Sequence, residues 1–262
     1  MNHIEANKRA WSLLSKDHYK HYKKRLEEDS YAFNPLILKE LGDIAGKKIL
    51  HLQCNTGADT IALSKMGAKA TGVDLVPENI YFARQLARDL EVNNVDFIES
   101  DIMKLTDNHV GKYDIVFTSD GAIGWLPDLN KWAKTVKHFL KEDGFLYVHD
   151  SHPFYLTLDE DKIEKGIVEI KYPYFSKEPD ESDEIGGYAT EAREAKNYYW
   201  MYTMGSLINS LAQSGLFIEY INEYDRCVPG MGGTALDEEG LSYYPHLEGA
   251  FPVVFSLKAV PR

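Results

Sequence analysis

Residues 47–75, KKILHLQCNTGADTIALSKMGAKATGVDL, decide the fold of this chain of 262 residues. The apolar run over 49–52 lies between polar residues, which predicts a strand buried on both faces. An apolar segment at helical spacing follows over 61–66, and a second strand over 70–73 leads to Asp74. The stretch therefore predicts a strand, a tight loop, a helix and a second strand.

A unit of this kind binds a nucleoside at the carboxyl ends of its strands. Parallel strands joined by a helix open a crevice there, and the first loop presents backbone N–H groups to the ligand. Asp74 ends the second strand, where a carboxylate can accept hydrogen bonds from both ribose hydroxyls. This Rossmann-like arrangement alone leaves nicotinamide, flavin and S-adenosylmethionine open as ligands.

The loop after the first strand favours a ligand without a pyrophosphate. A dinucleotide site needs the pattern G-x-G-x-x-G, so that the backbone can approach the phosphates closely. Gln53 and Asn55 occupy the first two glycine positions, and only Gly57 remains. Because S-adenosylmethionine carries no phosphate, the loop favours it and disfavours an NAD-dependent oxidoreductase.

Four motifs, in this order, resemble those of class I S-adenosylmethionine-dependent methyltransferases. They are LQCNTG at 52–57, GVDLVPENI at 72–80, ESDIM at 99–103 and KYDIVFTSDGAIGWLPDL at 112–129. HLQC, GAIGWLPDL and the HDSHP at 149–153 are similar, more narrowly, to a group of bacterial small-molecule methyltransferases. The resemblance implies an α/β fold with a seven-stranded, mostly parallel sheet in the order 3-2-1-4-5-7-6 and helices on both faces.

The resemblance also implies S-adenosylmethionine as the cofactor, S-adenosylhomocysteine as the product, and a set of cofactor contacts. Asp74 would bind the ribose and Leu75 would also contact the cofactor, while Asp101 would take the adenine amino group and Ile102 would stack on the ring. The other expected cofactor residues are Gln53, Cys54, Asn55, Gly57 and Thr60 in the first loop and helix, Ser119 after the fourth strand, and His18 and Tyr22 near the N-terminus.

The first motif departs from the usual methyltransferase pattern. His51 stands where an acidic residue is usual, and Gln53 and Asn55 replace glycines. Asn tolerates a left-handed backbone better than most residues, so Asn55 can preserve the turn. The leading hypothesis is methyl transfer to a small-molecule acceptor; the alternative is a non-catalytic S-adenosylmethionine-binding or interaction module.

Residues 1–45 are predicted to form a helical lid, and residues 46–262 the S-adenosylmethionine-binding domain. Two helices are expected in the lid, over 2–30 and 35–44. Similar segments close over the cofactor in methyltransferases, and the candidate lid residues are Asn7, Trp11, His18 and Tyr22.

The periodic pattern continues beyond Asp74. Helices are predicted from Pro77, from Asp128 to Gly144, and after Thr203. The other expected strands cover residues 95–98, 112–119, 145–148, 216–220 and 253–257.

A segment at about 152–202 interrupts this pattern and is expected to cap the acceptor site. Alternating residues over 168–174 and 198–202 predict two antiparallel strands, and the acidic stretch over 177–187 predicts a mobile loop between them. The candidate substrate residues are Trp125, Tyr172, Tyr174 and Trp200.

Asp120, His149 and His152 are the candidate catalytic residues, because a general base is needed when the acceptor must lose a proton. His149, Asp150 and His152 also raise the hypothesis of a metal site. We do not expect one, since successive strand residues alternate between faces and no further acidic cluster accompanies them.

Composition limits the partners. A formal charge of −12 argues against nucleic acid, because phosphate contacts need clustered Lys and Arg. Cys54 and Cys227 are the only cysteines, which is typical of a reducing compartment. The polar N-terminus is unlike a signal peptide, and no apolar run reaches the length of a membrane span. A cytoplasmic protein with a small-molecule acceptor, and with neither nucleic acid nor membrane as a partner, is expected.

Overall fold

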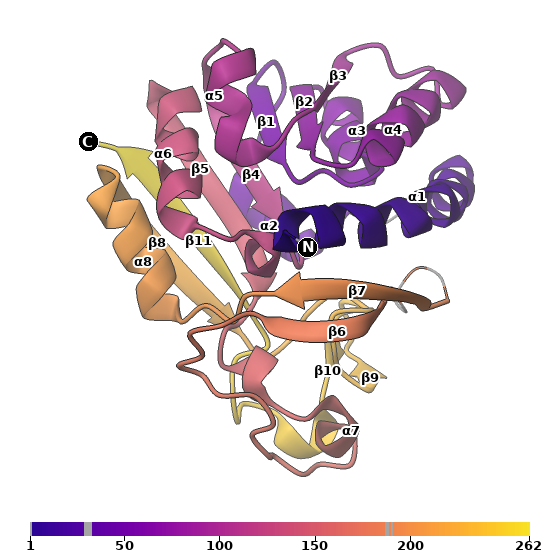
Figure 1. The fold of residues 1–262 in the computed structure, drawn as a ribbon, viewed down its shortest axis with the longest axis vertical. Coiled ribbons are helices and arrows are strands. Elements are labelled where there is room, and N and C mark those ends of the chain that lie inside the picture. The colour runs from indigo at the N-terminus through magenta and orange to yellow at the C-terminus, as the bar shows by residue number, and fades with distance from the viewer. Residues whose placement is uncertain (1, 29–32, 187–188, 190) are drawn as a thin grey trace.

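A seven-stranded sheet forms the centre of the computed structural model, which describes residues 2–28, 33–186, 189 and 191–262 (Figure 1). The strands lie side by side in the order β3 (Val95–Glu99), β2 (Lys69–Asp74), β1 (Lys48–Leu52), β4 (Tyr113–Ser119), β5 (Leu140–Ser151), β11 (Val254–Pro261) and β8 (Leu216–Tyr224). Neighbours from β3 to β5 pair in parallel, and β11 is antiparallel to both β5 and β8. The predicted Rossmann-like order 3-2-1-4-5-7-6 is confirmed.

Helices cover both faces of the sheet. One face carries α5 (Leu105–Asn108), α6 (Leu129–Phe139) and α8 (Met204–Gln213), and the other carries α2 (Pro35–Leu41), α3 (Ala58–Lys65) and α4 (Pro77–Asp89). The long helix α1 (His3–Glu27) crosses in front of the carboxyl ends of the strands (Figure 1).

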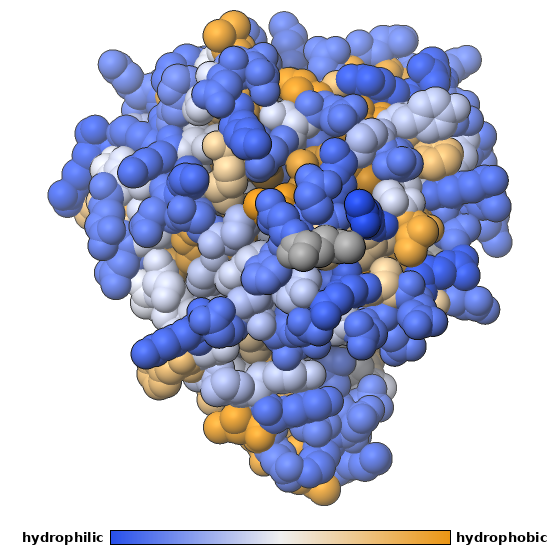
Figure 2. Space-filling view, viewed as in Figure 1, coloured by the Kyte–Doolittle hydropathy of each residue, from blue (hydrophilic) through white to orange (hydrophobic). Residues whose placement is uncertain are grey.

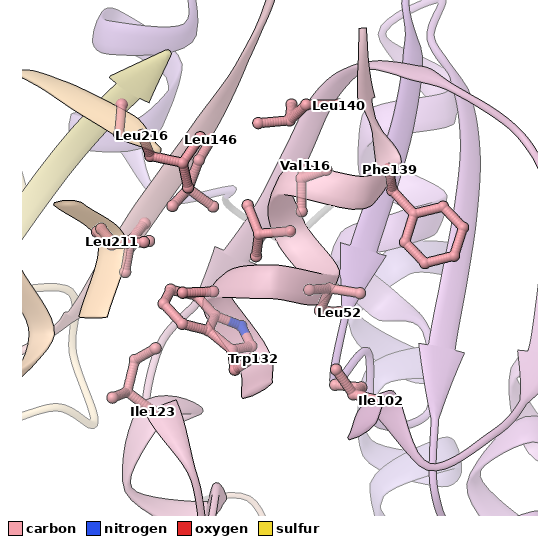
Figure 3. Close-up of a cluster of buried hydrophobic side chains, with 14 of the residues drawn as sticks. Leu52, Ile102, Val116, Ile123, Trp132, Phe139, Leu140, Leu146, Leu211 and Leu216 are labelled. Atoms are coloured by element: carbon pink, nitrogen blue, oxygen red, sulfur yellow. The ribbon is translucent and has the colours of Figure 1, made fainter. Parts of the chain in front are cut away.

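The larger apolar core lies under α6 and α8. Trp132 and Phe139 of α6 are fully buried against strand residues that include Val116 and Leu146 (Figure 3). Burying each such side chain contributes about 1.5–3 kcal/mol. This core fixes the position of β4 and β5, whose ends reach the candidate site.

A partly buried carboxylate, Glu40, attaches α2 to the opposite face. Glu40 accepts hydrogen bonds from the hydroxyls of Tyr147 (2.5 Å), Tyr224 (2.5 Å) and Ser256 (2.8 Å), and from Nδ2 of Asn222 (2.6 Å). Burial opposes ionisation of Glu40, but these donors outweigh it and lower the pKa of the carboxyl. One side chain thus joins α2 to β5, β8 and β11.

We expect Glu40→Ala to lower the free energy of unfolding by on the order of 3 kcal/mol, because it leaves the buried Tyr147 hydroxyl without its acceptor. Urea unfolding of the variant measures this loss. Glu142→Ala is the matched control, because Glu142 is exposed and should change the free energy by less than about 0.5 kcal/mol. Equal stability of the two variants would contradict the prediction.

The segment between β5 and α8 differs from its prediction. A hairpin of β6 (Asp180–Ile185) and β7 (Arg193–Tyr199) is present, so the middle of the acidic stretch predicted as a loop, residues 180–185, forms a strand; residue 187 lies outside the described residues. The predicted strand over 168–174 is wrong: those residues are largely exposed, and only Ile170 makes an isolated bridge. The helix predicted from Asp128 to Gly144 ends earlier, because β5 begins at Leu140.

The hairpin is held by α1. Asn7 donates from Nδ2 to the Tyr198 carbonyl (2.8 Å) and accepts from the Tyr198 N–H (2.7 Å), as a neighbouring strand would. Arg193 and Asp17 form an ion pair at 2.7 Å. Ile185 is buried against Leu14, which gives the acidic strand one apolar contact. This tertiary support explains why β6 forms despite its composition. Of the helix predicted over 2–30, the part from residue 29 onward lies outside the described residues.

The short helix α7 (Glu160–Ile163) lies below the hairpin in Figure 1. The strand pair of β9 (Ala235–Leu236) and β10 (Ser242–Tyr243) lies there too. The face shown in Figure 2 is mainly hydrophilic, in keeping with the high charge content of the chain. Among the described helices, none combines the length and the apolar character needed to cross a bilayer.

Candidate functional site

A cavity of about 1080 Å³ opens at the carboxyl ends of β1, β2, β4 and β5. Ligand pockets usually measure about 300–1,000 Å³, so this cavity is as large as the largest of them. Its walls come from the first loop, α1, the hairpin, and the segments 151–164 and 228–244. It lies at the topological switch point between β1 and β4, where open α/β sheets bind their ligands.

The first loop keeps the left-handed turn of a glycine-rich loop, although Gln53 and Asn55 replace two of its glycines. The φ angles of Gln53, Asn55 and Gly57 are 59°, 50° and 80°, all in the left-handed region. The prediction that Asn55 preserves the turn is therefore confirmed. Gln53 is held in this conformation by a hydrogen bond from Nε2 to the Ala122 carbonyl (2.7 Å), which offsets part of the backbone strain.

Asp74 lies on the cavity wall directly beneath this loop. Its carboxylate accepts hydrogen bonds from the N–H groups of Asn55 (2.9 Å) and Val76 (2.9 Å) and from Nδ2 of Asn79 (3.1 Å). Burial raises the pKa of Asp74 to about 6 despite these donors. The carboxylate is thus fixed in orientation and is ionised at neutral pH.

His51 replaces the usual acidic residue as a neutral group. Its Nδ1 lies 2.8 Å from the Thr60 hydroxyl, and burial lowers the pKa of the imidazole to about 3. Thr60 is itself fully buried beside His51 and does not line the cavity. The His51–Thr60 pair therefore joins β1 to α3, with His51 forming part of the cavity wall.

Asp120 projects into the cavity from the end of β4. It has a left-handed backbone, with a φ of 44°, and accepts a hydrogen bond from Nδ1 of His149 at 2.5 Å. His149 is fully buried, which would lower its pKa, but the Asp120 carboxylate outweighs burial and raises it. The structure thus joins two of the three predicted catalytic residues, with only Asp120 reaching the cavity.

Asp150 shapes the loop that follows Asp120. Its two carboxylate oxygens accept hydrogen bonds from the N–H groups of Gly121 (2.8 Å), Ala122 (3.0 Å) and Ile123 (2.8 Å). The side chain is 2% exposed, so these bonds are shielded from water. A strand residue therefore sets the course of the loop beside the candidate base.

The comparison with protein families identifies the chain. Residues 44–203, more than half of its length, match the family model of a methyltransferase domain. The chain belongs to this methyltransferase family. Because class I methyltransferases take their methyl group from S-adenosylmethionine, that molecule is the cofactor.

Curated relatives cover part of this methyltransferase. A ubiquinone biosynthesis O-methyltransferase of Actinobacillus pleuropneumoniae is 30% identical over 125 residues, which are 45% of this chain and 53% of the relative. A proposed protein N5-glutamine methyltransferase of Methanocaldococcus jannaschii is 28% identical over 151 residues, 50% of this chain and 73% of the relative. The chain thus spans about half the length of the ubiquinone enzyme.

Solved structures share the fold over most of the chain. An S-adenosylmethionine-dependent methyltransferase from Mesorhizobium loti has a TM-score of 0.61 at 19% identity, covering 86% of this chain and 95% of its own. A related structure from Listeria monocytogenes has a TM-score of 0.58 at 19% identity, covering 87% and 97%. At this identity the likeness concerns the fold.

Residues on the cavity wall fit the cofactor. Thr56 is almost fully buried, and its Oγ1 has no hydrogen-bond partner among the described residues. Oε1 of Gln53 is also buried without a partner, and both side chains line the cavity. Such atoms are costly unless a ligand or water satisfies them. Together with Asp74, they give the cavity wall polar groups of the kind that a nucleoside and an amino acid can satisfy.

Most of the predicted cofactor residues meet at this cavity. They come from β1, β2, the loop after β3, β4 and α1: Gln53, Cys54, Asn55, Asp74, Leu75, Asp101, Ile102, Ser119 and Tyr22 line it. Trp125 lines it as well and stacks edge-on against Trp11 and Tyr199, with ring centroids 5.1 and 5.2 Å apart. This aromatic group closes the side of the cavity under α1 and the hairpin.

Other predicted site residues lie outside the cavity wall. Gly57 allows α3 to pack on Phe97, because a Cβ there would lie 2.6 Å from the ring. His18 is buried with Nδ1 3.3 Å from Asn55 Oδ1, and His152 pairs with Glu223 at 2.9 Å. The remaining residues that do not line the cavity are Thr60, His149, Tyr172, Tyr174 and Trp200.

The wrong strand prediction over 168–174 explains two of the displaced aromatic residues, Tyr172 and Tyr174, whereas Trp200 directly follows the end of β7. Tyr174 instead accepts a hydrogen bond from the N–H of Met204 at the start of α8 (3.1 Å). Tyr199, next to Trp200, lines the cavity as an aromatic residue of the hairpin. A shift of one residue along a strand reverses the side chain, so the face of the hairpin decided which aromatic residue enters.

Several wall residues escaped the sequence analysis. Asp59 lines the cavity and accepts a hydrogen bond from the Ser119 hydroxyl at 3.2 Å. Its position in the first turn of α3, directly after the loop, was the signal that could have found it. Asn34, Tyr155 and Tyr244 line the cavity from distant segments, and no motif marks them.

Proposed function

We propose that the protein transfers the methyl group of S-adenosylmethionine to a small-molecule acceptor, with Asp120 as the base that receives the acceptor's proton. The observation that carries this proposal is the Asp120 carboxylate, fixed by His149 and projecting into the cavity. The preserved turn of the first loop supports cofactor binding, which both this function and a non-catalytic S-adenosylmethionine-binding module require.

When bound, the cofactor supplies an electrophilic methyl group on a sulfonium. The chain's own task is to align the acceptor, to exclude water and to hold a proton. His149 keeps the Asp120 carboxylate oriented through its Nδ1–H, and Asp150 fixes the adjoining loop. Asp120 then takes the proton that an acceptor hydroxyl or amine loses on methylation.

A small acceptor suits the walls of the cavity. Trp11 of α1, Trp125 and Tyr199 of the hairpin close one side, and the segments 151–164 and 228–244 close another. Aromatic walls of this kind bind compact, partly apolar molecules. They support a metabolite more than an extended polypeptide.

We propose further that α1 and the β6–β7 hairpin act together as the lid. Asn7 binds the backbone of Tyr198 at both its N–H and its carbonyl, so the two elements are joined beside the aromatic wall. In this division, residues 46–262 form the domain that binds S-adenosylmethionine. Residues 1–45, together with the segment inserted in that domain at about 152–202, cover its ligand site. Both segments would need to move for the ligands to enter.

Turnover of S-adenosylmethionine with separated cell extracts tests the proposed function. Formation of S-adenosylhomocysteine is expected with the small-metabolite fraction and not with the protein fraction. A product formed only with protein would overturn the small-molecule acceptor. Binding of S-adenosylhomocysteine without turnover in any fraction would favour the non-catalytic module.

A further inference from the structure

Two groups of buried hydrogen-bond donors face the cavity without acceptors. Asn34 is 5% exposed, lines the cavity and uses its Oδ1 to cap α2 through the Leu36 N–H (3.0 Å). Its Nδ2 has no partner among the described residues. A buried amide in this state needs an oxygen or nitrogen acceptor from a ligand or water.

The second group is a pair of tyrosines. The hydroxyls of Tyr155 and Tyr244 lie 2.9 Å apart, and both side chains are buried and line the cavity. One hydroxyl donates to the other, so the second proton has no acceptor within the part of the chain that the structure describes. The pair therefore presents one donor to a ligand.

These donors belong to one end of the cavity. Leu36 of α2, two residues after Asn34, packs against the cluster that contains Tyr155, Tyr244 and Cys227. Tyr155 follows β5, the strand whose His149 bonds Asp120, and the same cluster contains Val254 of β11. The donors thus lie on the β5–β11 side of the sheet, whereas Asp74 ends β2, which β1 and β4 separate from β5.

Carboxylates restrict what these donors can bind. The segments 151–164 and 228–244 add Glu160, Glu164 and Glu239 to the wall, and neither segment contributes a Lys or Arg to it. The strong bases of the wall, Lys8 and Arg25, both come from α1. An anionic ligand at the donor end would face Asp120 and the three glutamates.

We infer that Asn34, Tyr155 and Tyr244 form the recognition site for the methyl acceptor, and that the acceptor carries an uncharged oxygen such as a carbonyl. The inference rests on the proposed function, since it names the class of molecule that enters beside Asp120. Donors without a cation select a neutral oxygen, and the surrounding carboxylates exclude a carboxylate ligand. The aromatic wall favours a ring as the rest of the molecule.

Three probes with one shared phenol ring test this inference on the protein loaded with S-adenosylhomocysteine: para-hydroxybenzamide, para-ethylphenol and para-hydroxybenzoate. Calorimetry is expected to give the amide about tenfold tighter binding than the ethyl compound, the difference of about one hydrogen bond, and the benzoate the weakest binding. Equal affinities, tighter binding of the benzoate, or no binding of any probe would overturn the inference.

Two variants identify the residues responsible. Tyr155→Phe with Tyr244→Phe removes both hydroxyls, and Asn34→Asp keeps the cap of α2 while removing the free donor. Each should abolish the preference for the amide. Tyr113→Phe is the control, because neither Tyr113 nor His109, the partner of its hydroxyl (2.6 Å), lines this cavity, and its loss should leave the preference intact. A retained preference in both test variants would contradict the assignment.

The affinity for S-adenosylhomocysteine separates this inference from the proposed function. Wild-type protein that does not bind S-adenosylhomocysteine contradicts the proposed function itself. Protein that binds it normally but shows the wrong order among the probes contradicts only the recognition site.

Discussion

Asp120→Asn is expected to lower kcat by about 10²–10⁴-fold, the usual contribution of a general base. Asn is similar in size, tolerates the left-handed backbone of this position and can still contact Nδ1 of His149, so the fold should remain intact. The amide cannot take up the acceptor's proton at neutral pH. Initial rates with the acceptor identified by turnover measure the loss.

The affinity for S-adenosylhomocysteine should stay nearly unchanged in this variant, because Asp120 acts on the acceptor. Asp128→Asn is the matched control: Asp128 caps α6 and does not line the cavity, and Asn caps helices as well as Asp does. Activity in Asp120→Asn equal to that of the control would show that the acceptor needs no base.

Asp74→Asn should weaken the binding of S-adenosylhomocysteine by about 1–3 kcal/mol, or about five- to 150-fold. The substitution keeps one acceptor for the N–H groups of Asn55 and Val76 but removes the charge that strengthens hydrogen bonds from the ribose. Calorimetric titration measures the change. Asp96→Asn, an exposed substitution on β3, is the control; the same affinity in both variants would remove Asp74 from the ribose site.

The raised pKa of Asp74 predicts the pH dependence of this affinity. A carboxyl with a pKa of about 6 is ionised at pH 7 and becomes protonated as the pH falls through 6. Cofactor affinity should therefore fall on acidification in the wild-type protein and not in Asp74→Asn. The folding stability of the ligand-free protein should follow the opposite trend. Because folding raises the pKa of Asp74, the contribution of this group to stability is lost as the pH rises through about 6.

The sheet order and the cofactor half of the cavity could be predicted because local patterns determine them. Each strand of the Rossmann-like unit is a short apolar run, and Asp74 and Asp101 follow such runs directly. Parallel topology then brings the strand ends together without further information. The loop after β1 followed the same logic, and its left-handed turn survived the loss of two glycines.

The acceptor half could not be predicted because distant contacts determine it. Composition predicts a mobile loop over the acidic stretch, yet β6 forms there because Ile185 packs on Leu14 and Asn7 binds the backbone of β7. Tyr155 and Tyr244 meet across 89 residues of sequence. Neither contact leaves a periodic signal along the chain. The hydrogen bonds of Glu40 to three strands could not be predicted for the same reason.

The hydrogen bonds from Gly121, Ala122 and Ile123 to Asp150 bear on how new acceptor specificities could arise in this protein. The course of that loop is imposed by a carboxylate on β5, so it does not depend on the loop's own side chains. Substitutions on the neighbouring cavity wall can therefore accumulate while the backbone beside Asp120 keeps its shape. Directed evolution toward new acceptors should accordingly find tolerated changes at Trp125 and Tyr199 before any at Asp150.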